Sequence, residues 1–209
     1  DTKISIESGN VIGTKEEGTI EFKNVSFKYP DAEEYILNDI DFSVNKGETV
    51  AFIGSTGSGK STLINLIPRF YDVTEGEILV DGINVKDYKL EELYNKIGYI
   101  SQKPIIFDGT ISSNVNFGTS KKRITKKDIE EAIKLSEAEE FVLKMDNKYN
   151  EHIASSGSNI SGGQKQRLSI ARAIAREPEI YIFDDSFSAL DYKTDATLRS
   201  ELKKYTKDA

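Results

Sequence analysis

The stretch GSTGSGKST, residues 54–62, carries the strongest structural signal in the chain. It fits the pattern G-x-x-x-x-G-K-[ST], in which glycines let the backbone wrap closely around phosphate groups with its N–H groups pointing inward. A short apolar run precedes it (ETVAFIG, 48–54), and residues 60–70 have apolar side chains at helical spacing. A buried strand, a glycine-rich turn and a helix are the context this pattern requires, so the stretch predicts a nucleotide-phosphate site.

The residues of this phosphate loop have distinct expected roles. The Lys60 ammonium is expected to neutralise the β- and γ-phosphates, and the Ser61 hydroxyl to take one position on Mg²⁺. The loop backbone would bind the remaining phosphate oxygens. The predicted nucleotide-binding residues of the loop are Gly54, Ser55, Thr56, Gly57, Ser58, Gly59, Lys60, Ser61 and Thr62.

A second apolar run, EIYIFDD (179–185), ends in two adjacent carboxylates. The run predicts a strand buried on both faces. Asp184 would then reach the Mg²⁺ at the phosphate loop, directly or through a water, and Asp185 could orient a reacting water.

Composition and charge argue against several other classes of protein. The 209 residues suffice for one large domain with a full core, and the formal charge of −7 argues against a non-specific nucleic-acid binder. The absence of cysteine excludes a disulfide framework and thiol chemistry. No apolar run approaches the ~18 residues of a membrane span, and the first residues do not resemble a signal peptide. If the protein works at a membrane, another segment must hold it there.

The order of elements predicts an α/β fold. It combines a mostly parallel sheet flanked by helices, an antiparallel β subdomain and a helical subdomain over about 103–165. Residues 1–18 are interpreted as a linker. Thr125 and Asp128 have capping-box spacing at the start of a helix predicted over 125–145. The other expected strands are 19–29 and 35–44 (an antiparallel pair), 76–82 and 96–102, and the other expected helices are 162–177 and a last helix containing Leu198, Leu202 and Tyr205.

The segment NISGGQKQR, residues 159–167, narrows the family. Ser161 can cap the helix that follows, and Gly162 and Gly163 leave backbone N–H groups facing outward toward an anion. Together with the phosphate loop and Asp184, this signature segment resembles that of the ATP-binding cassette (ABC) ATPases. The resemblance extends from about residue 19 to the end of the chain and implies a P-loop NTPase core, with ATP and Mg²⁺ as ligands.

In that family two cassettes bind head to tail, so that each ATP lies between the phosphate loop of one and the signature of the other. The resemblance therefore implies that Ser161, Gly162, Gly163 and Gln164 serve the partner's ATP. It implies further roles for three single residues. Tyr29 would stack on adenine, Gln102 would touch Mg²⁺ and the attacking water, and Asp191 of SALD (188–191) would cross the dimer interface.

The segments FYDVTEGEILVDG and IFDGTISSNV resemble the exporter branch of the family. There the cassette usually follows a membrane domain in the same polypeptide. The resemblance implies a location at the cytoplasmic face of the cell membrane, a transmembrane domain and a second cassette as partners, and no nucleic acid.

Asp185 departs from the family pattern, which has Glu at this position. One methylene fewer withdraws the carboxylate by about 1.5 Å, and a misplacement of about 1 Å can cost on the order of 100-fold in rate. We therefore expect this site to bind ATP well and to hydrolyse it slowly. The intact Ser-Gly-Gly-Gln, with Ile160 in place of the usual leucine, suggests one half of a heterodimer with a Glu-bearing partner. The alternative is a homodimer in which a small shift of the water makes Asp185 adequate.

The family also has a switch histidine about thirty residues past the Asp–Glu pair, a position beyond Ala209. The single histidine, His152, lies upstream of the signature and is expected at the surface. Residues 153–159 replace the charged loop of homodimeric exporters, and the fragment alone is expected to be weakly active. Three alternatives stay open: a regulatory nucleotide-binding module with ATP as dimer glue, a soluble cassette of DNA repair or translation, and an importer ATPase.

Overall fold

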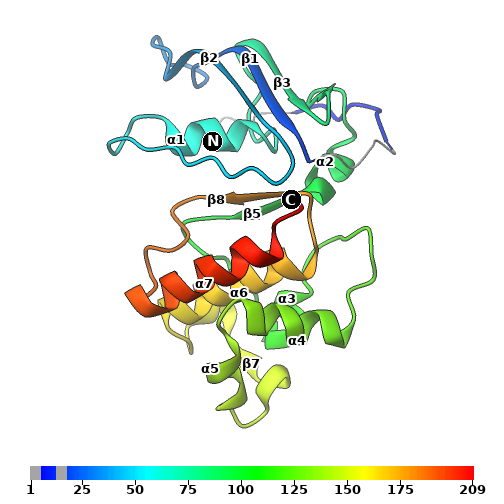
Figure 1. Ribbon diagram of the computed structural model, residues 1–209, viewed down its shortest axis with the longest axis vertical. Helices are drawn as coiled ribbons and strands as arrows, with labels where there is room; N and C mark the ends of the chain where they lie inside the picture. Colours follow the sequence, from blue (N-terminus) through cyan, green and yellow to red (C-terminus); the bar gives the residue numbers. More distant parts are fainter. Residues whose placement is uncertain (1–5, 13–17) are drawn as a thin grey trace. The chain divides into compact units, whose positions relative to one another are not determined.

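The computed structural model describes residues 6–12 and 18–209 and divides the chain into two compact units (Figure 1). The first unit comprises Asp1–Ile97 with Asp208–Ala209, and the second comprises Gly98–Lys207. The predicted linker over residues 1–18 therefore lies partly outside the described residues. No helix among those described is both long and apolar enough to cross a bilayer.

The first unit is built on a four-stranded antiparallel sheet with the strand order β2-β1-β3-β4. The predicted pairing of its first two strands is confirmed: Phe22 lies opposite Phe42, and their rings stack with centroids 4.4 Å apart. Helix α1 follows the phosphate loop. The elements are β1 (Ile20–Phe27), β2 (Leu37–Val44), α1 (Lys60–Leu66), β3 (Glu75–Val80), β4 (Ile83–Asn84) and α2 (Leu90–Lys96).

The buried strand predicted over residues 48–54 is wrong. The segment carries no strand assignment, and Ile53 is 96% exposed. A strand buried on both faces lies inside a sheet that is covered on both sides, and the described sheet of this unit, β2-β1-β3-β4, does not include this segment. Phe52 still contacts the ring of Phe42, at a centroid distance of 5.4 Å.

The second unit is mostly helical. Strand β5 (Ile97–Ile100), which begins at the unit boundary, pairs with β8 (Ile180–Phe183), and β6 (Gly109–Thr110) pairs with β7 (His152–Ile153). The α-helices are α3 (Ile111–Val115), α4 (Lys126–Leu135), α5 (Glu139–Leu143), α6 (Gly162–Ala175) and α7 (Tyr192–Tyr205), with short 3₁₀ turns at Lys148–Asn150 and Ser155–Gly157. The helices predicted over 162–177 and around Leu198 are confirmed as α6 and α7.

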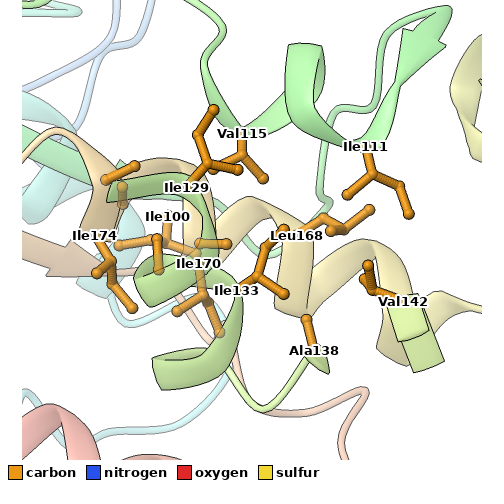
Figure 2. Close-up of a cluster of buried hydrophobic side chains, with 14 of the residues drawn as sticks. Ile100, Ile111, Val115, Ile129, Ile133, Ala138, Val142, Leu168, Ile170 and Ile174 are labelled. Atoms are coloured by element: carbon orange, nitrogen blue, oxygen red, sulfur yellow. The ribbon is translucent and has the colours of Figure 1, made fainter. Parts of the chain in front are cut away.

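Helix α6 lies at the centre of the hydrophobic core of this unit (Figure 2). Helices α3 and α4 pack against it. Leu168 and Ile170 of α6 are fully buried, as are Val115 of α3 and Ile133 of α4. Because each such aliphatic side chain stabilises the fold by roughly 1.5–3 kcal/mol on burial, this core fixes α6 and the signature segment at its start.

The capping box predicted at Thr125 is confirmed. The Thr125 hydroxyl accepts from the Asp128 amide at 3.3 Å, and the Thr125 amide donates to Asp128 Oδ2 at 2.7 Å. The Thr125 hydroxyl also donates to Asp128 Oδ2 at 2.7 Å. This bond, followed by the one from the Thr125 amide, lowers the pKa of the Asp128 carboxyl.

The single helix predicted over 125–145 is wrong, because the chain breaks it into α4 and α5. Glu137 adopts a left-handed conformation with φ 57°. Its amide donates to the Lys134 carbonyl at 3.0 Å, and the Ala138 amide donates to the Ile133 carbonyl at 2.9 Å. These two bonds form a Schellman motif, which satisfies the last carbonyls of α4 and ends it. Apolar periodicity continues through the break, so the sequence pattern did not reveal it.

Residues 6–12 form an arm that docks on the first unit. The Val11 amide donates to the Asp87 carbonyl at 2.8 Å, and the Gly9 amide donates to the Tyr88 carbonyl at 3.0 Å. Arg69, only 5% exposed, donates to the Glu7 carbonyl at 2.8 Å. The arm is thus an ordered part of this unit.

Substituting Gly9→Ala is expected to release the arm, because an added Cβ would lie 2.2 Å from the Asp87 carbonyl oxygen. A glutamyl endoprotease should then cleave after Glu7 faster than in the wild type. Asn10→Ala, a change at the exposed neighbouring position, should leave the rate unchanged. Equal cleavage of all three proteins would contradict the docking.

A buried ion pair anchors the end of α2. Lys96 Nζ lies 2.7 Å from Asp81 Oδ2, and both side chains are fully inaccessible. The Thr19 amide donates to the other carboxylate oxygen at 2.9 Å. A buried pair of this kind contributes little over an apolar replacement, but breaking it leaves an uncompensated charge.

Substituting Lys96→Met is expected to lower the free energy of unfolding by about 3–5 kcal/mol, because the Asp81 carboxylate stays buried and loses the Lys96 ammonium. Adding Asp81→Asn should recover part of that loss. Urea denaturation of both variants measures the effect. If the free energy of unfolding of Lys96→Met alone lies within about 1 kcal/mol of the wild type, another group compensates the charge of Asp81.

Candidate functional site

The phosphate loop wraps around the ammonium of its own lysine. Lys60 Nζ donates to the carbonyls of Gly54 and Ser55, each at 2.8 Å, and to Ser58 Oγ at 3.3 Å. Residues 54–58 of the loop are exposed, and α1 begins at Lys60. A cation gathered into a curled, accessible loop is suited to attract phosphate oxygens.

Two glycines of this loop need conformations that other residues rarely adopt. Gly57 has φ 84° and Gly59 has φ 88°. At Gly57 an added Cβ would meet no atom within 4 Å, so only the backbone conformation requires glycine there. At Gly59 a Cβ would also lie 3.0 Å from Leu37 Cδ2, so close packing adds to the requirement.

Tyr29 lies in the same unit as the phosphate loop and is tied to it. Its hydroxyl is 2.9 Å from the hydroxyl of Thr62 in α1. The ring meets Phe27 and Tyr71 edge-on, and it lines a surface cavity together with Tyr71 and Asp72. This geometry holds an aromatic ring beside an opening, as a stacking platform for a base requires.

The two predicted catalytic residues of the second unit contact each other. Gln102 Nε2 donates to Asp185 Oδ2 at 2.9 Å. Asp185 follows the end of β8 and has φ 45°, a left-handed conformation that Asp tolerates better than most residues. The structure therefore brings together the amide and the carboxylate that the sequence separates by 83 positions.

Tyr99 is a neighbour of Asp184 that sequence reasoning missed. The Tyr99 hydroxyl donates to Asp184 Oδ2 at 3.2 Å. Burial first, and then the charge of Asp184, raise the pKa of this hydroxyl, so it stays protonated and a donor. Nothing in the sequence around Tyr99, a tyrosine in a short strand, indicated that its hydroxyl contacts Asp184.

Arg172 anchors the segment that follows Gln102, and it was also missed. Its guanidinium donates to the carbonyls of Ile105 and Asn114, each at 2.8 Å. The stacked rings of Phe107 and Phe117 lie within 5.7 Å of it. Burial, followed by the charge of Arg176, lowers the pKa of Arg172 to about 10, so it stays charged at neutral pH.

The signature segment begins α6 with a reciprocal cap. The Ser161 hydroxyl accepts from the Gln164 amide at 3.3 Å, and the Ser161 amide donates to Gln164 Oε1 at 2.8 Å. An added Cβ at Gly162 would meet nothing within 4 Å, whereas one at Gly163 would lie 3.2 Å from the Ala189 carbonyl. Gly163 thus lets the start of α6 approach the SALD segment closely.

Asp191 caps α7, a role that the sequence analysis did not assign. Its carboxylate accepts from the Thr194 amide at 3.0 Å and from the Thr194 hydroxyl at 2.7 Å. The bond from the Thr194 hydroxyl, followed by the bond from the Thr194 amide, lowers the pKa of the Asp191 carboxyl. The spacing of Asp and Thr before a helix could have indicated the cap.

His152 is exposed, as predicted. Its Nε2 lies 3.3 Å from Asp108 Oδ1 at the surface of the second unit.

Each unit by itself holds groups of the kinds that bind ATP or Mg²⁺. The first unit has the curled loop around Lys60, the Ser61 hydroxyl and the Tyr29 ring. The second unit has Gln102, Asp184 and the helix start at Ser161. Hydroxyl, amide and carboxylate oxygens are the ligands that Mg²⁺ prefers, alongside phosphates.

Comparison with known proteins decides the family, because residues 37–188 match the ABC transporter family. The chain belongs to this family. It is 45% identical over 192 residues to a protein of Staphylococcus aureus (strain NCTC 8325) whose name describes a multidrug export ATP-binding/permease protein. A protein of the same description from the bovine strain RF122 / ET3-1 is 44% identical. In both cases the match covers 92% of this chain and 33% of the relative, so the chain spans about a third of their length.

A solved structure of a bacterial Atm1-family ABC exporter with ATP bound matches all of this chain and 36% of its own, with 30% identity and a TM-score of 0.89. This match confirms the predicted fold class, a mixed α/β ABC ATP-binding domain with an antiparallel sheet and helices.

Substituting Lys60→Ala is expected to weaken binding of Mg·ATP by about 10- to 150-fold, because a charge-assisted contact to phosphate is lost. Calorimetric titration measures the change. Lys46→Ala, which removes an exposed lysine of the same unit, should leave the affinity unchanged. Equal losses in both variants would indicate a general effect of charge.

Proposed function

We propose that this chain is the ATP-binding and ATP-hydrolysing domain of an exporter, and that its own site hydrolyses ATP slowly. The observation that carries the proposal is the contact of Gln102 with Asp185 in a member of the ABC transporter family. Residues 1–18 would connect a preceding transmembrane domain to the ATPase domain at 19–209, with the helical subdomain over about 103–165. The transmembrane domain would hold the chain at the cytoplasmic face of the membrane.

The first unit would bind the nucleotide. The Tyr29 ring would stack on adenine, the Lys60 ammonium would leave its loop carbonyls for the phosphates, and Ser61 would coordinate Mg²⁺. When bound, Mg²⁺ supplies charge neutralisation for the transferring phosphoryl group. Backbone amides of loop residues 54–59 would donate to the phosphate oxygens, and the Ser58 amide would exchange its bond to the Ser55 carbonyl for one of them.

The second unit would supply the groups that act on water and the surface that meets the partner. Asp184 would hold Mg²⁺, with Tyr99 fixing one of its oxygens, and Gln102 and Asp185 would position the attacking water. Ser161, Gly162, Gly163 and Gln164 would meet the partner's ATP, and Asp191 would lie at the dimer interface. A Glu-bearing partner would carry out most of the hydrolysis.

A second candidate function is a regulatory module in which ATP holds the dimer together and turns over rarely. The short carboxylate of Asp185, already engaged by Gln102, favours it for this half. Both functions can coexist in one heterodimer. The export named for the Staphylococcus aureus relatives supports an exporter over an importer or a soluble cassette.

Substituting Asp185→Glu in the full-length protein is expected to raise the single-turnover hydrolysis rate by roughly 100-fold, because the carboxylate regains about 1.5 Å of reach. ATP affinity should stay constant. Asp185→Asn, which removes the charge at constant size, should be slower than the wild type. A wild type as fast as the Glu variant would sink the weak-site proposal and favour a competent homodimer.

A further inference from the structure

Gln166 is a buried polar side chain on the core face of α6. It is 1% exposed and lies on the same helix as the buried Leu168 and Ile170. Its Nε2 donates to the Ser101 carbonyl at 3.3 Å. Its Oε1 is buried and has no hydrogen-bond donor in the part of the chain that the structure describes.

Packing alone does not explain glutamine at this position. A buried acceptor without a donor costs free energy, because it loses its hydrogen bonds to water on folding and forms none within the protein. Methionine has nearly the same shape and would fill the space without that cost. The amide donor of Gln166 is therefore the feature that distinguishes it from an apolar residue.

The Gln166 amide holds Ser101, the residue next to Gln102, through the bond to the Ser101 carbonyl. The preceding carbonyl, of Ile100, accepts from the Asp184 amide at 2.9 Å and from the Ser186 hydroxyl at 2.6 Å. Gln102 in turn donates to Asp185. Ile100 and Gln102 are thus hydrogen-bonded to residues at the end of β8. Ser101, which lies between them, is hydrogen-bonded to α6.

Gln166 lies in the second turn of the helix that begins at Ser161. A helix moves as a rigid element, so a displacement of its start also displaces Gln166. The hydrogen bond to Ser101 passes that displacement to Gln102, and from there to the Asp185 carboxylate. Within the described residues, Gln166 is the only side chain of α6 that has a hydrogen bond to residues 100–102.

We propose that Gln166 is a positioning residue that couples the signature end of α6 to the Asp185 carboxylate, through Ser101 and Gln102. The proposal rests on the proposed function, in which Ser161 and Gly163 meet the partner's ATP. Gln166 then links the two nucleotide sites of the dimer, so that Asp185 is correctly placed only when the signature is engaged.

The test is Gln166→Met in the full-length protein, with two independent measurements. Hydrogen–deuterium exchange of a peptide spanning 97–107 should speed up about fivefold, the effect of losing one hydrogen bond. The thermal midpoint should stay constant or rise, because the orphaned Oε1 is gone. Single-turnover hydrolysis should fall about tenfold at unchanged ATP affinity.

Two further variants separate positioning from packing. Gln166→Leu also removes the donor but has a different apolar shape, so it should match the Met variant in exchange and hydrolysis. Ser169→Ala, at another buried polar position of α6, should leave both unchanged.

Unchanged exchange at 97–107 in the Met variant would overturn the proposal. A lower thermal midpoint with faster exchange throughout the core would also overturn it, since that outcome indicates a packing role. If the wild type binds no ATP, the proposed function fails, and exchange still decides whether Gln166 orders residues 101–102.

Discussion

The carbonyl oxygen of Ile100 accepts two hydrogen bonds, from the Asp184 amide and the Ser186 hydroxyl, and the arrangement of the second unit depends on it. These bonds join the ends of β5 and β8. They place Gln102 against Asp185, since each residue lies within two positions of the junction. The apolar core around α6 supports this junction from one side, because Gln166 reaches it from the core face of that helix.

The first unit depends on a different interaction, which keeps the Lys60 ammonium accessible to phosphate groups. The Lys60 ammonium donates to two carbonyls of its own loop, and among the described residues it forms no ion pair. Exchanging carbonyl oxygens for phosphate oxygens then costs little reorganisation. Stability comes from elsewhere in this unit, from the antiparallel sheet and the apolar side chains that it buries.

Features set by local chemistry could be predicted from the sequence. The Thr125 cap, the pairing of β1 with β2 and the helix after the signature all follow from short patterns, and the glycines at 57 and 59 have the conformations their loop requires. Features set by distant partners could not. The end of α4 at Glu137, the exposed segment 48–54 and the contacts of Tyr99 and Gln166 depend on which elements pack together. Apolar periodicity does not encode those choices.

We propose that this member of the ABC transporter family binds ATP without cleaving it quickly, because Asp185 is one methylene shorter than the family's glutamate. The most direct measurement follows the fate of γ-labelled ATP bound to the full-length wild-type protein, by rapid mixing and quenching with magnesium present. The account predicts that the label at the site of this chain stays in intact ATP long after the partner's site has turned over. Cleavage at both sites with the same time course would contradict it.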